Sequence, residues 1–198
     1  MPDYTLNKVF QKLSTESEKL ERLIYLQQFV DLEVDARLFE MDSSYASEVV
    51  KRRVQQPNEL GCVEHTLQRR EPYAKVNLRQ KDFGNQYLHH IALIAADRKN
   101  ELKAVVATNK SLSQNDHNRL QVSHLCHNSY CVNHNHLVVE AAKDNLARNS
   151  CKGSHNIQFF IAGDEYIWNG CPHRKSPLHK HCILPFRTVE MNPGYNCI

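Results

Sequence analysis

The chain has 198 residues, of which 41% are hydrophobic and 24% are charged, enough for a buried core. This composition excludes a disordered chain and a collagen-like repeat. No run approaches the roughly 18 apolar residues of a membrane span, and residues 1–10 are too polar for a signal peptide. We therefore expect an intracellular protein with no membrane partner, whose seven cysteines and twelve histidines are available to metals rather than to disulfides.

The net charge of +3 is unevenly distributed. Residues 1–50 carry ten acidic and five basic side chains, whereas residues 51–198 carry twelve acidic and twenty basic ones. A basic region of this kind can bind a polyanion. Residues 15–27 show helical spacing behind a capping box of Thr15 and Glu18, and a second helix is predicted over 45–55. We predict a helical N-terminal arm over residues 1–56 and a second domain over residues 57–198.

After Pro57 the pattern changes. Residues 62–68 and 74–79 predict two strands that turn at Glu71-Pro72, the second with alternating polar and apolar residues. Residues 84–98 predict a buried helix, 102–108 a strand and 109–118 a polar loop. A strand over 120–124, a Cys/His-rich loop, a strand over 136–140 and a helix over 141–149 follow. Residues 157–168 predict an inserted β-hairpin, so the fold class is α+β.

The Cys/His-rich loop indicates a metal site. Cys126, Cys131 and His136 recur at five-residue steps, and thiolates and imidazoles are the ligands of closed, four-coordinate Zn²⁺ sites. Cys62 is the predicted fourth ligand, because it opens the preceding hairpin and is the only thiol upstream. Together these residues predict a first structural zinc ion.

A second set of ligands follows farther along the chain. Cys151, Cys171, His173 and Cys182 predict a second structural zinc ion, so we expect two per chain. His179 and His181 lie close to Cys182 in the sequence and are rival ligands. Cys197 has no assigned partner.

The stretch over residues 123–151 also carries a family pattern. Its elements are His124-Leu125-Cys126-His127-Asn128, Cys131, His136-Leu137, Asp144-Asn145, Arg148-Asn149 and Cys151. This pattern resembles the His-Cys box of intron-encoded homing endonucleases, whose nuclease core is the ββα-metal (His-Me finger) motif. The resemblance covers about residues 60 to 182. It implies a zinc-stabilised ββα-metal nuclease core with antiparallel β-hairpins, alongside the N-terminal helical arm.

The resemblance implies three catalytic roles. His124 takes the position of the general base that activates water, and Asn145 that of the side chain holding a single Mg²⁺. Arg79 resembles the arginine that clamps the scissile phosphate, with Arg69 and Arg70 as competitors. A neutral imidazole can act in this way near neutral pH if its other ring nitrogen is held by an acceptor. One amide oxygen suits Mg²⁺, which keeps most of its waters.

The implied activity is Mg²⁺-dependent, site-specific cutting of double-stranded DNA by a homodimer, located in the nucleus if the host is eukaryotic. DNA would be read by the hairpin before the box, since a two-stranded ribbon fits the major groove. Its candidate DNA-binding residues are Gln68, Arg70, Lys75 and Asn77. Two alternatives stay open: a zinc-stabilised DNA-binding protein that does not cut, and a non-specific nuclease of the same fold.

Overall fold

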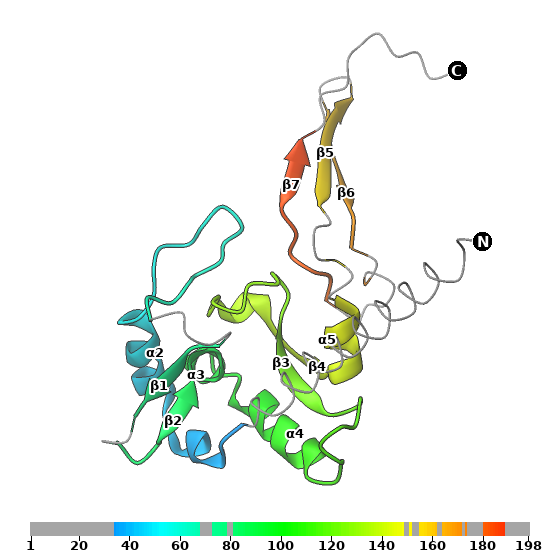
Figure 1. The fold of residues 1–198 in the computed structure, drawn as a ribbon. Helices are drawn as coiled ribbons and strands as arrows, with labels where there is room; N and C mark the ends of the chain where they lie inside the picture. The colour runs from blue at the N-terminus through cyan, green and yellow to red at the C-terminus, as the bar shows by residue number, and fades with distance from the viewer. Residues whose placement is uncertain are drawn as a thin grey trace, which may run out of the picture.

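The computed structural model describes residues 34–67, 73–78, 81–148, 151, 155–161, 164–171, 173 and 180–188. Within these residues the fold is mixed α+β, with two antiparallel two-stranded sheets and one three-stranded sheet (Figure 1). The elements in chain order are η1 Ala36–Glu40, α2 Ser43–Lys51, β1 Lys75–Asn77, β2 Asn85–Tyr87, α3 Leu88–Ala95, α4 Lys99–Asn109, β3 Leu120–His124, η3 His134–His136, β4 Leu137–Ala141, α5 Ala142–Arg148, β5 Asn156–Ile161, β6 Asp164–Asn169 and β7 Phe186–Thr188.

The helix α3 lies at the centre of the main hydrophobic core. Its residues 88–94 are all buried, and the fully buried apolar side chains are Leu88, Ile91, Leu93 and Ile94. Residues 34–49 pack into the same core, with α2 lying against α3. The Asp42 side chain caps α2 by accepting a hydrogen bond from the Tyr45 backbone N–H at 2.7 Å. Lys99 joins η1 to α4 by donating from Nζ to two backbone carbonyls, those of Phe39 and Met41.

The prediction of a strand over residues 102–108 is wrong, because these residues lie in α4. Leu102 and Val105 are buried at helical spacing, so the β-branched residues there do not decide the local structure. The predicted helix over 84–98 is in part a strand, β2, and its remainder forms α3. α3 ends before Asp97, whose positive φ of 57° interrupts the chain ahead of α4.

The predicted strand over 62–68 is also absent from the described residues 62–67, which make only two isolated bridges, Val54 with His65 and Glu64 with Cys131. β1 pairs instead with β2, with Lys75 opposite Tyr87 and Asn77 opposite Asn85. The predicted alternation along β1 is confirmed, since Val76 is buried and Lys75 and Asn77 are exposed. The polar-faced hairpin is therefore β1–β2.

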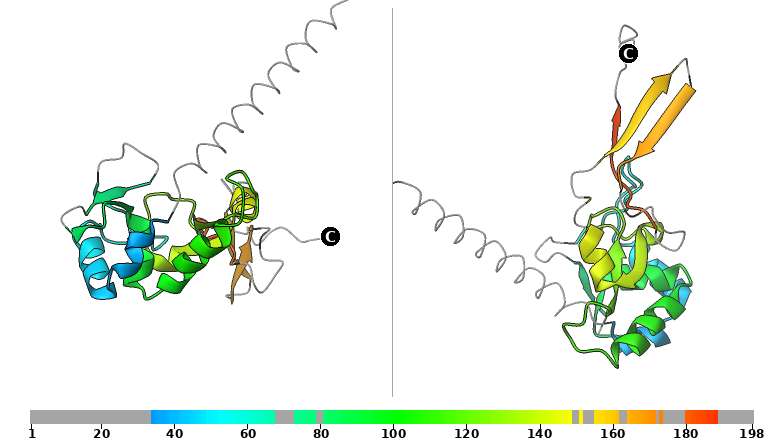
Figure 2. Two further views of the ribbon diagram at one scale, coloured as in Figure 1. Left: turned by 90° about the horizontal axis from the view of Figure 1, so that it is seen from below. Right: turned by 90° about the vertical axis from the view of Figure 1, so that its right-hand side faces the viewer.

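The succession of β3, β4 and α5 is confirmed to within one or two residues of its predicted bounds. β3 and β4 are antiparallel, with Leu120 opposite Ala141 and His124 opposite Leu137. The inserted hairpin is also confirmed as β5–β6, to which β7 adds in parallel beside β5. Figure 2 shows this three-stranded sheet extending away from the β3–β4–α5 region. The predicted helix over 15–27 lies outside the described residues, and no described helix is long and apolar enough to cross a membrane.

Leu93→Ala tests the central role of α3. Removing a fully buried leucine is expected to lower the free energy of unfolding by about 2–5 kcal/mol, from lost burial and the cavity left behind. The matched control is Leu146→Ala on α5, where the side chain is 41% exposed and the expected loss is below about 1 kcal/mol. Denaturant unfolding of both variants measures the difference, and equal losses would contradict the placement of the core.

Candidate functional site

The first predicted ligand set comes together as one cluster of four side chains. Cys62, Cys126, Cys131 and His136 are all buried, and their ligand atoms lie within 4.8 Å of one another. Cys62 precedes an irregular segment rather than a strand, but that segment is held against the loop by a hydrogen bond from Val132 N to the Val63 carbonyl at 2.8 Å. We call this group the first cluster.

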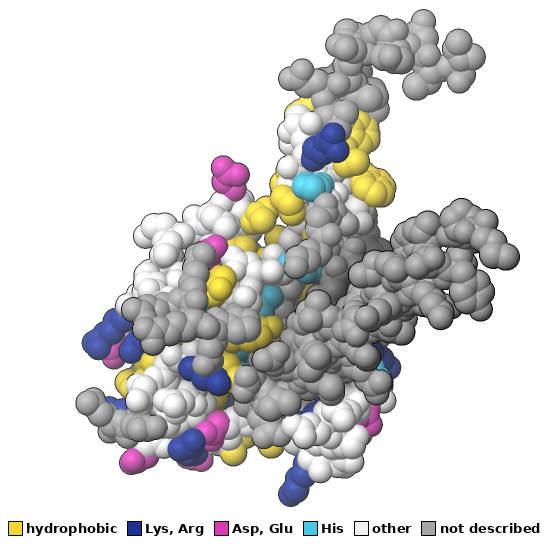
Figure 3. Space-filling view, in the orientation of Figure 1, with side chains coloured by type: hydrophobic (Ala, Val, Ile, Leu, Met, Phe, Trp, Pro, Cys, Tyr) yellow, Lys and Arg dark blue, Asp and Glu magenta, His cyan; other side chains and the backbone are white. Residues whose placement is uncertain are grey.

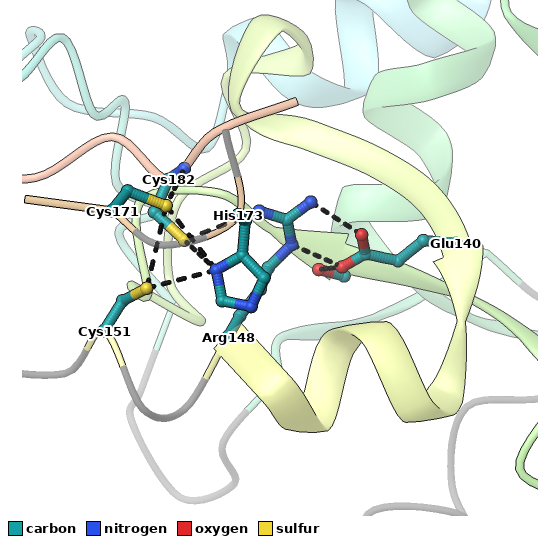
Figure 4. Close-up of polar contacts among 7 residues, drawn as sticks. Glu140, Arg148, Cys151, Cys171, His173 and Cys182 are labelled. Atoms are coloured by element: carbon teal, nitrogen blue, oxygen red, sulfur yellow. Dashed lines mark hydrogen bonds and ion pairs between the residues drawn. The ribbon is translucent and has the colours of Figure 1, made fainter. Parts of the chain in front are cut away.

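The second predicted set also comes together. Cys151 follows α5, Cys171 follows β6, and His173 and Cys182 complete a group whose ligand atoms again lie within 4.8 Å (Figure 4). His181, a rival ligand, is exposed and lies outside this group, and His179 lies outside the described residues. We call this group the second cluster.

Both clusters fit tetrahedral Zn²⁺. Bonds of about 2.3 Å to sulfur and 2.0–2.1 Å to nitrogen separate the ligand atoms by about 3.8 Å for two sulfurs and about 3.6 Å for sulfur and nitrogen. In the first cluster His136 Nδ1 lies 3.6 Å from the sulfurs of both Cys62 and Cys131. In the second cluster the two sulfurs of Cys151 and Cys171 are 3.7 Å apart, and His173 Nδ1 is 3.5 Å from Cys171. Each group can therefore hold one zinc ion.

The thiols of the first cluster are electrostatically linked. The hydrogen bond between Cys126 and Cys131 raises the pKa of Cys126 and lowers the pKa of Cys131. One thiolate is thus favoured even before a metal arrives, while its neighbour keeps a proton. Binding of Zn²⁺ releases such protons, because a metal takes the thiolate form.

His124, at the end of β3, is fixed by the loop of the first cluster. Its Nε2–H donates to the backbone carbonyl of Cys131 over 3.0 Å. Burial lowers the pKa of His124 to about 4, so the ring is neutral near pH 7. With the proton on Nε2, the other nitrogen, Nδ1, carries a lone pair that can accept a proton.

Aromatic rings surround His124 on its other side. Tyr73 stacks on it with ring centroids 5.8 Å apart, and His89 of α3 meets it edge-on at 5.4 Å. Burial holds the pKa of His89 well below its usual value, so this neighbour is also neutral. Sequence reasoning missed Tyr73 and His89, since nothing in the local pattern shows that α3 and the residues just before β1 lie beside the end of β3.

Asn145 lies on α5, and its side chain is half-buried. On the same side of the helix, three residues before and after it, are the buried residues Ala142 and Arg148. The Asn145 side chain makes no hydrogen bond with the described part of the chain, so its amide oxygen is available to a ligand. The chemistry of this oxygen suits Mg²⁺.

Several predicted residues lie outside the described part of the chain: Arg79, Gln68, Arg69, Arg70 and Cys197. Lys75 and Asn77 are described, exposed and on one face of β1. A further polar group was missed by sequence reasoning, namely the buried ion pair of Glu140 and Arg148, which contacts both Ser123 and Cys182. A charged residue eight positions from its partner gives no local signal of burial.

Comparisons with known proteins give one family. Residues 61–193 match the model described as the zinc-binding loop region of homing endonuclease. Neither the comparison with curated proteins nor that with solved structures gives a match. The matched range contains both clusters, His124 and Asn145.

Metal analysis tests the clusters. The purified chain is expected to hold two zinc ions, and Cys131→Ser or Cys171→Ser is expected to hold one, because each removes one of four ligands. Cys197→Ser is the matched control and is expected to keep both. The measurement is elemental analysis of folded protein after exhaustive dialysis. A folded wild-type chain without zinc would contradict the assignment.

Proposed function

Because the chain belongs to the family of the zinc-binding loop region of homing endonucleases, we propose that it is a Mg²⁺-dependent endonuclease that hydrolyses phosphodiester bonds of double-stranded DNA. The observation that supports this most is the state of His124, a neutral imidazole whose Nε2–H is fixed on the Cys131 carbonyl at 3.0 Å. Family membership indicates a nuclease, and site-specific cutting is part of the proposal.

His124 acts as the general base. Its Nδ1 takes a proton from a water molecule, which then attacks the phosphorus in line with the leaving 3′ oxygen. The Cys131 carbonyl stabilises the imidazolium that forms, because it accepts the Nε2–H throughout. No side chain forms a covalent intermediate in this scheme.

Asn145 supplies the protein ligand of the catalytic metal through its amide oxygen. When bound, Mg²⁺ stabilises charge on the phosphate and on the leaving oxygen. Arg79 lies outside the described residues, and its role as the phosphate clamp stays a prediction from the family pattern. In this scheme charge stabilisation provides most of the rate.

Zn²⁺ has a structural role in both clusters, with Cys62, Cys126, Cys131 and His136 as one ligand set and Cys151, Cys171, His173 and Cys182 as the other. Four protein ligands leave no open position for a substrate. DNA contact falls to the exposed face of β1, where Lys75 and Asn77 point the same way. A two-stranded ribbon such as β1–β2 can enter the major groove.

We also propose that the chain acts as a homodimer. Support comes from the sheet β6–β5–β7, where large apolar side chains are exposed by 44–56% on both faces, seen in yellow toward the upper end of Figure 3. Tyr166 and Trp168 lie on one face, and Phe160, Ile167 and Phe186 lie on the other. Apolar surface of this extent, rich in aromatic residues, is typical of an interface.

The strand register indicates which face of this sheet a second copy of the chain would cover. The pairing places Arg187, Ile157 and Trp168 in one row, with Phe159 stacked on Tyr166 at 5.6 Å in the next row of that face. A two-fold axis parallel to the strands would lay Arg187 of each copy over Trp168 of the other, a favourable cation–π contact.

His124→Ala tests the role of the base. With Mg²⁺ and a randomised duplex pool, the variant is expected to cut about 10²- to 10⁴-fold more slowly than wild type, the range for loss of a general base. Its DNA dissociation constant and its zinc content are expected to stay within about twofold, since neither depends on Nδ1.

The matched control for this variant is His134→Ala, an exposed histidine on η3, which is expected to cut like wild type. Cutting by His124→Ala at the wild-type rate would remove His124 from the mechanism. If the wild type binds duplex DNA but never cuts it with Mg²⁺ or Mn²⁺, the non-cleaving DNA-binding protein is the correct alternative.

Sedimentation velocity tests the dimer. The wild type is expected to dimerise, and Tyr166→Ser with Trp168→Ser to raise the dissociation constant by roughly 30-fold or more, from the loss of two aromatic anchors. The control changes the opposite face of the same sheet, Phe160→Ser with Ile167→Ser. A wild type that stays monomeric, or equal weakening by both pairs, would contradict this interface.

A further inference from the structure

Arg148, the last residue of α5, is a charged side chain that is only 2% exposed. All three of its guanidinium nitrogens have partners: Nε and Nη2 donate to the two carboxylate oxygens of Glu140, each at 2.7 Å, and Nη1 donates to the Cys182 sulfur at 3.4 Å. Figure 4 shows the guanidinium lying between Glu140 and the second cluster. This two-point contact with a carboxylate is the strongest and most directional pairing that arginine makes.

The ion pair is part of a longer chain of contacts. Glu140 Oε1 also accepts a hydrogen bond from the Ser123 hydroxyl at 2.6 Å. Ser123 directly precedes His124 on β3, Glu140 lies on β4, Arg148 on α5, and Cys182 in the second cluster. One polar network thus joins all three elements of the ββα unit to the second cluster.

Stability alone is a poor reason for such a network. The cost of removing two charges from water commonly cancels their attraction, and apolar side chains of similar volume often stabilise a core as well or better. The ion pair instead fixes the relative orientation of the two side chains, because a planar guanidinium and a carboxylate fit together in one geometry. A network of this kind is expected where a particular placement of the backbone matters.

The helix α5 is the element whose position such a network can fix. It has seven residues, fewer than an isolated helix needs for stability, so its position depends on tertiary contacts at its ends. Ala142 and Arg148 are its buried residues, and Asn145 lies midway between them on the same side. Because Asn145 has no hydrogen bond with the described part of the chain, the helix alone sets where its amide oxygen lies.

We propose that Arg148 is a positioning residue of the nuclease site, which locks α5, and with it Asn145, onto the β3–β4 hairpin that carries His124. This proposal rests on the proposed function. Arg148 touches neither substrate nor metal, and it acts through Glu140 on one side and the Cys182 thiolate on the other. The second cluster then supports the position of α5, which carries Asn145, and also stabilises the fold.

The network also balances charge around the second cluster. Three thiolates, one neutral imidazole and Zn²⁺ carry a formal charge of −1, and Glu140 adds another, with Arg148 between them. Lysine would keep the positive charge at this position, but it could not make the two-point contact with Glu140 and also reach the sulfur. The Arg148→Lys variant therefore separates the effect of the two-point contact with Glu140 from the effect of the positive charge.

The experiment compares Arg148→Lys, Glu140→Gln and Ser123→Ala with Lys143→Ala, a control at an exposed position of the same helix whose Nζ donates to Asn118 Oδ1 at 3.0 Å, outside the Glu140–Arg148 network. Cutting of the duplex pool is measured over a range of Mg²⁺ concentrations, together with zinc content and DNA affinity. Arg148→Lys and Glu140→Gln are expected to need about tenfold more Mg²⁺ for half-maximal rate, with DNA affinity unchanged. Excess Mg²⁺ is expected to restore most of their maximal rate, which a folding defect would not allow.

A second readout does not depend on cutting. The side-chain amide resonances of Asn145 are expected to shift in Arg148→Lys and Glu140→Gln without DNA, and to stay in place in Lys143→Ala. If Arg148→Lys loses zinc or fails to fold, Ser123→Ala decides, because it breaks only the far end of the network and is expected to raise the Mg²⁺ requirement about threefold.

Wild-type Mg²⁺ dependence and unshifted Asn145 resonances in the folded variants would overturn the positioning role while leaving the nuclease intact. A wild type that cuts no DNA would overturn the proposed function and this proposal with it. The two failures are distinguishable, because the first appears only in the variants.

Discussion

His124 owes its orientation to one hydrogen bond, from its Nε2–H to the backbone carbonyl of Cys131. That carbonyl belongs to a loop with little regular structure, so something else must keep it in place. The loop is closed by a hydrogen bond from Leu125 N to the His136 carbonyl at 2.8 Å, and its sulfur and imidazole ligands converge in the first cluster with Cys62. Zn²⁺ bound by these four ligands would hold the loop in place, since a hydrogen bond of about 1 kcal/mol could not do so alone.

The second cluster supports the same strand from the opposite side. Successive residues of a strand point to opposite faces, so Ser123 faces the Glu140–Arg148 pair while His124 faces the Cys131 carbonyl. The segments that carry the two clusters are also joined, because Ile183 N, next to Cys182, donates to the carbonyl of Leu125, next to Cys126, at 2.8 Å. The end of β3 is thus held between two metal-ligand groups, and a seven-residue helix can take a defined position beside it.

The parts of the fold that the sequence predicts well are those with local signals. Ligand spacing identifies both clusters, and alternation and turn residues identify β3, β4 and the β5–β6 hairpin. Residues 102–108 were misassigned because Val105 and Val106 favour a strand in isolation, whereas burial of Leu102 and Val105 against the core requires a helix. The partner of β1 was also misassigned, because strand pairing depends on contacts distant in the sequence. The Glu140–Arg148 pair and the Tyr73 and His89 rings beside His124 could not be predicted at all, since only the assembled fold brings them together.

We propose that this zinc-supported ββα unit cuts duplex DNA with a fixed imidazole as its base. The most direct measurement incubates the purified chain with a randomised duplex library and Mg²⁺, and sequences the ends that appear. New ends are expected within one recurrent sequence, and this sequence is expected to have two-fold symmetry if the protein cuts as a dimer. Duplex DNA that is bound but acquires no new ends with Mg²⁺ or Mn²⁺ would contradict it.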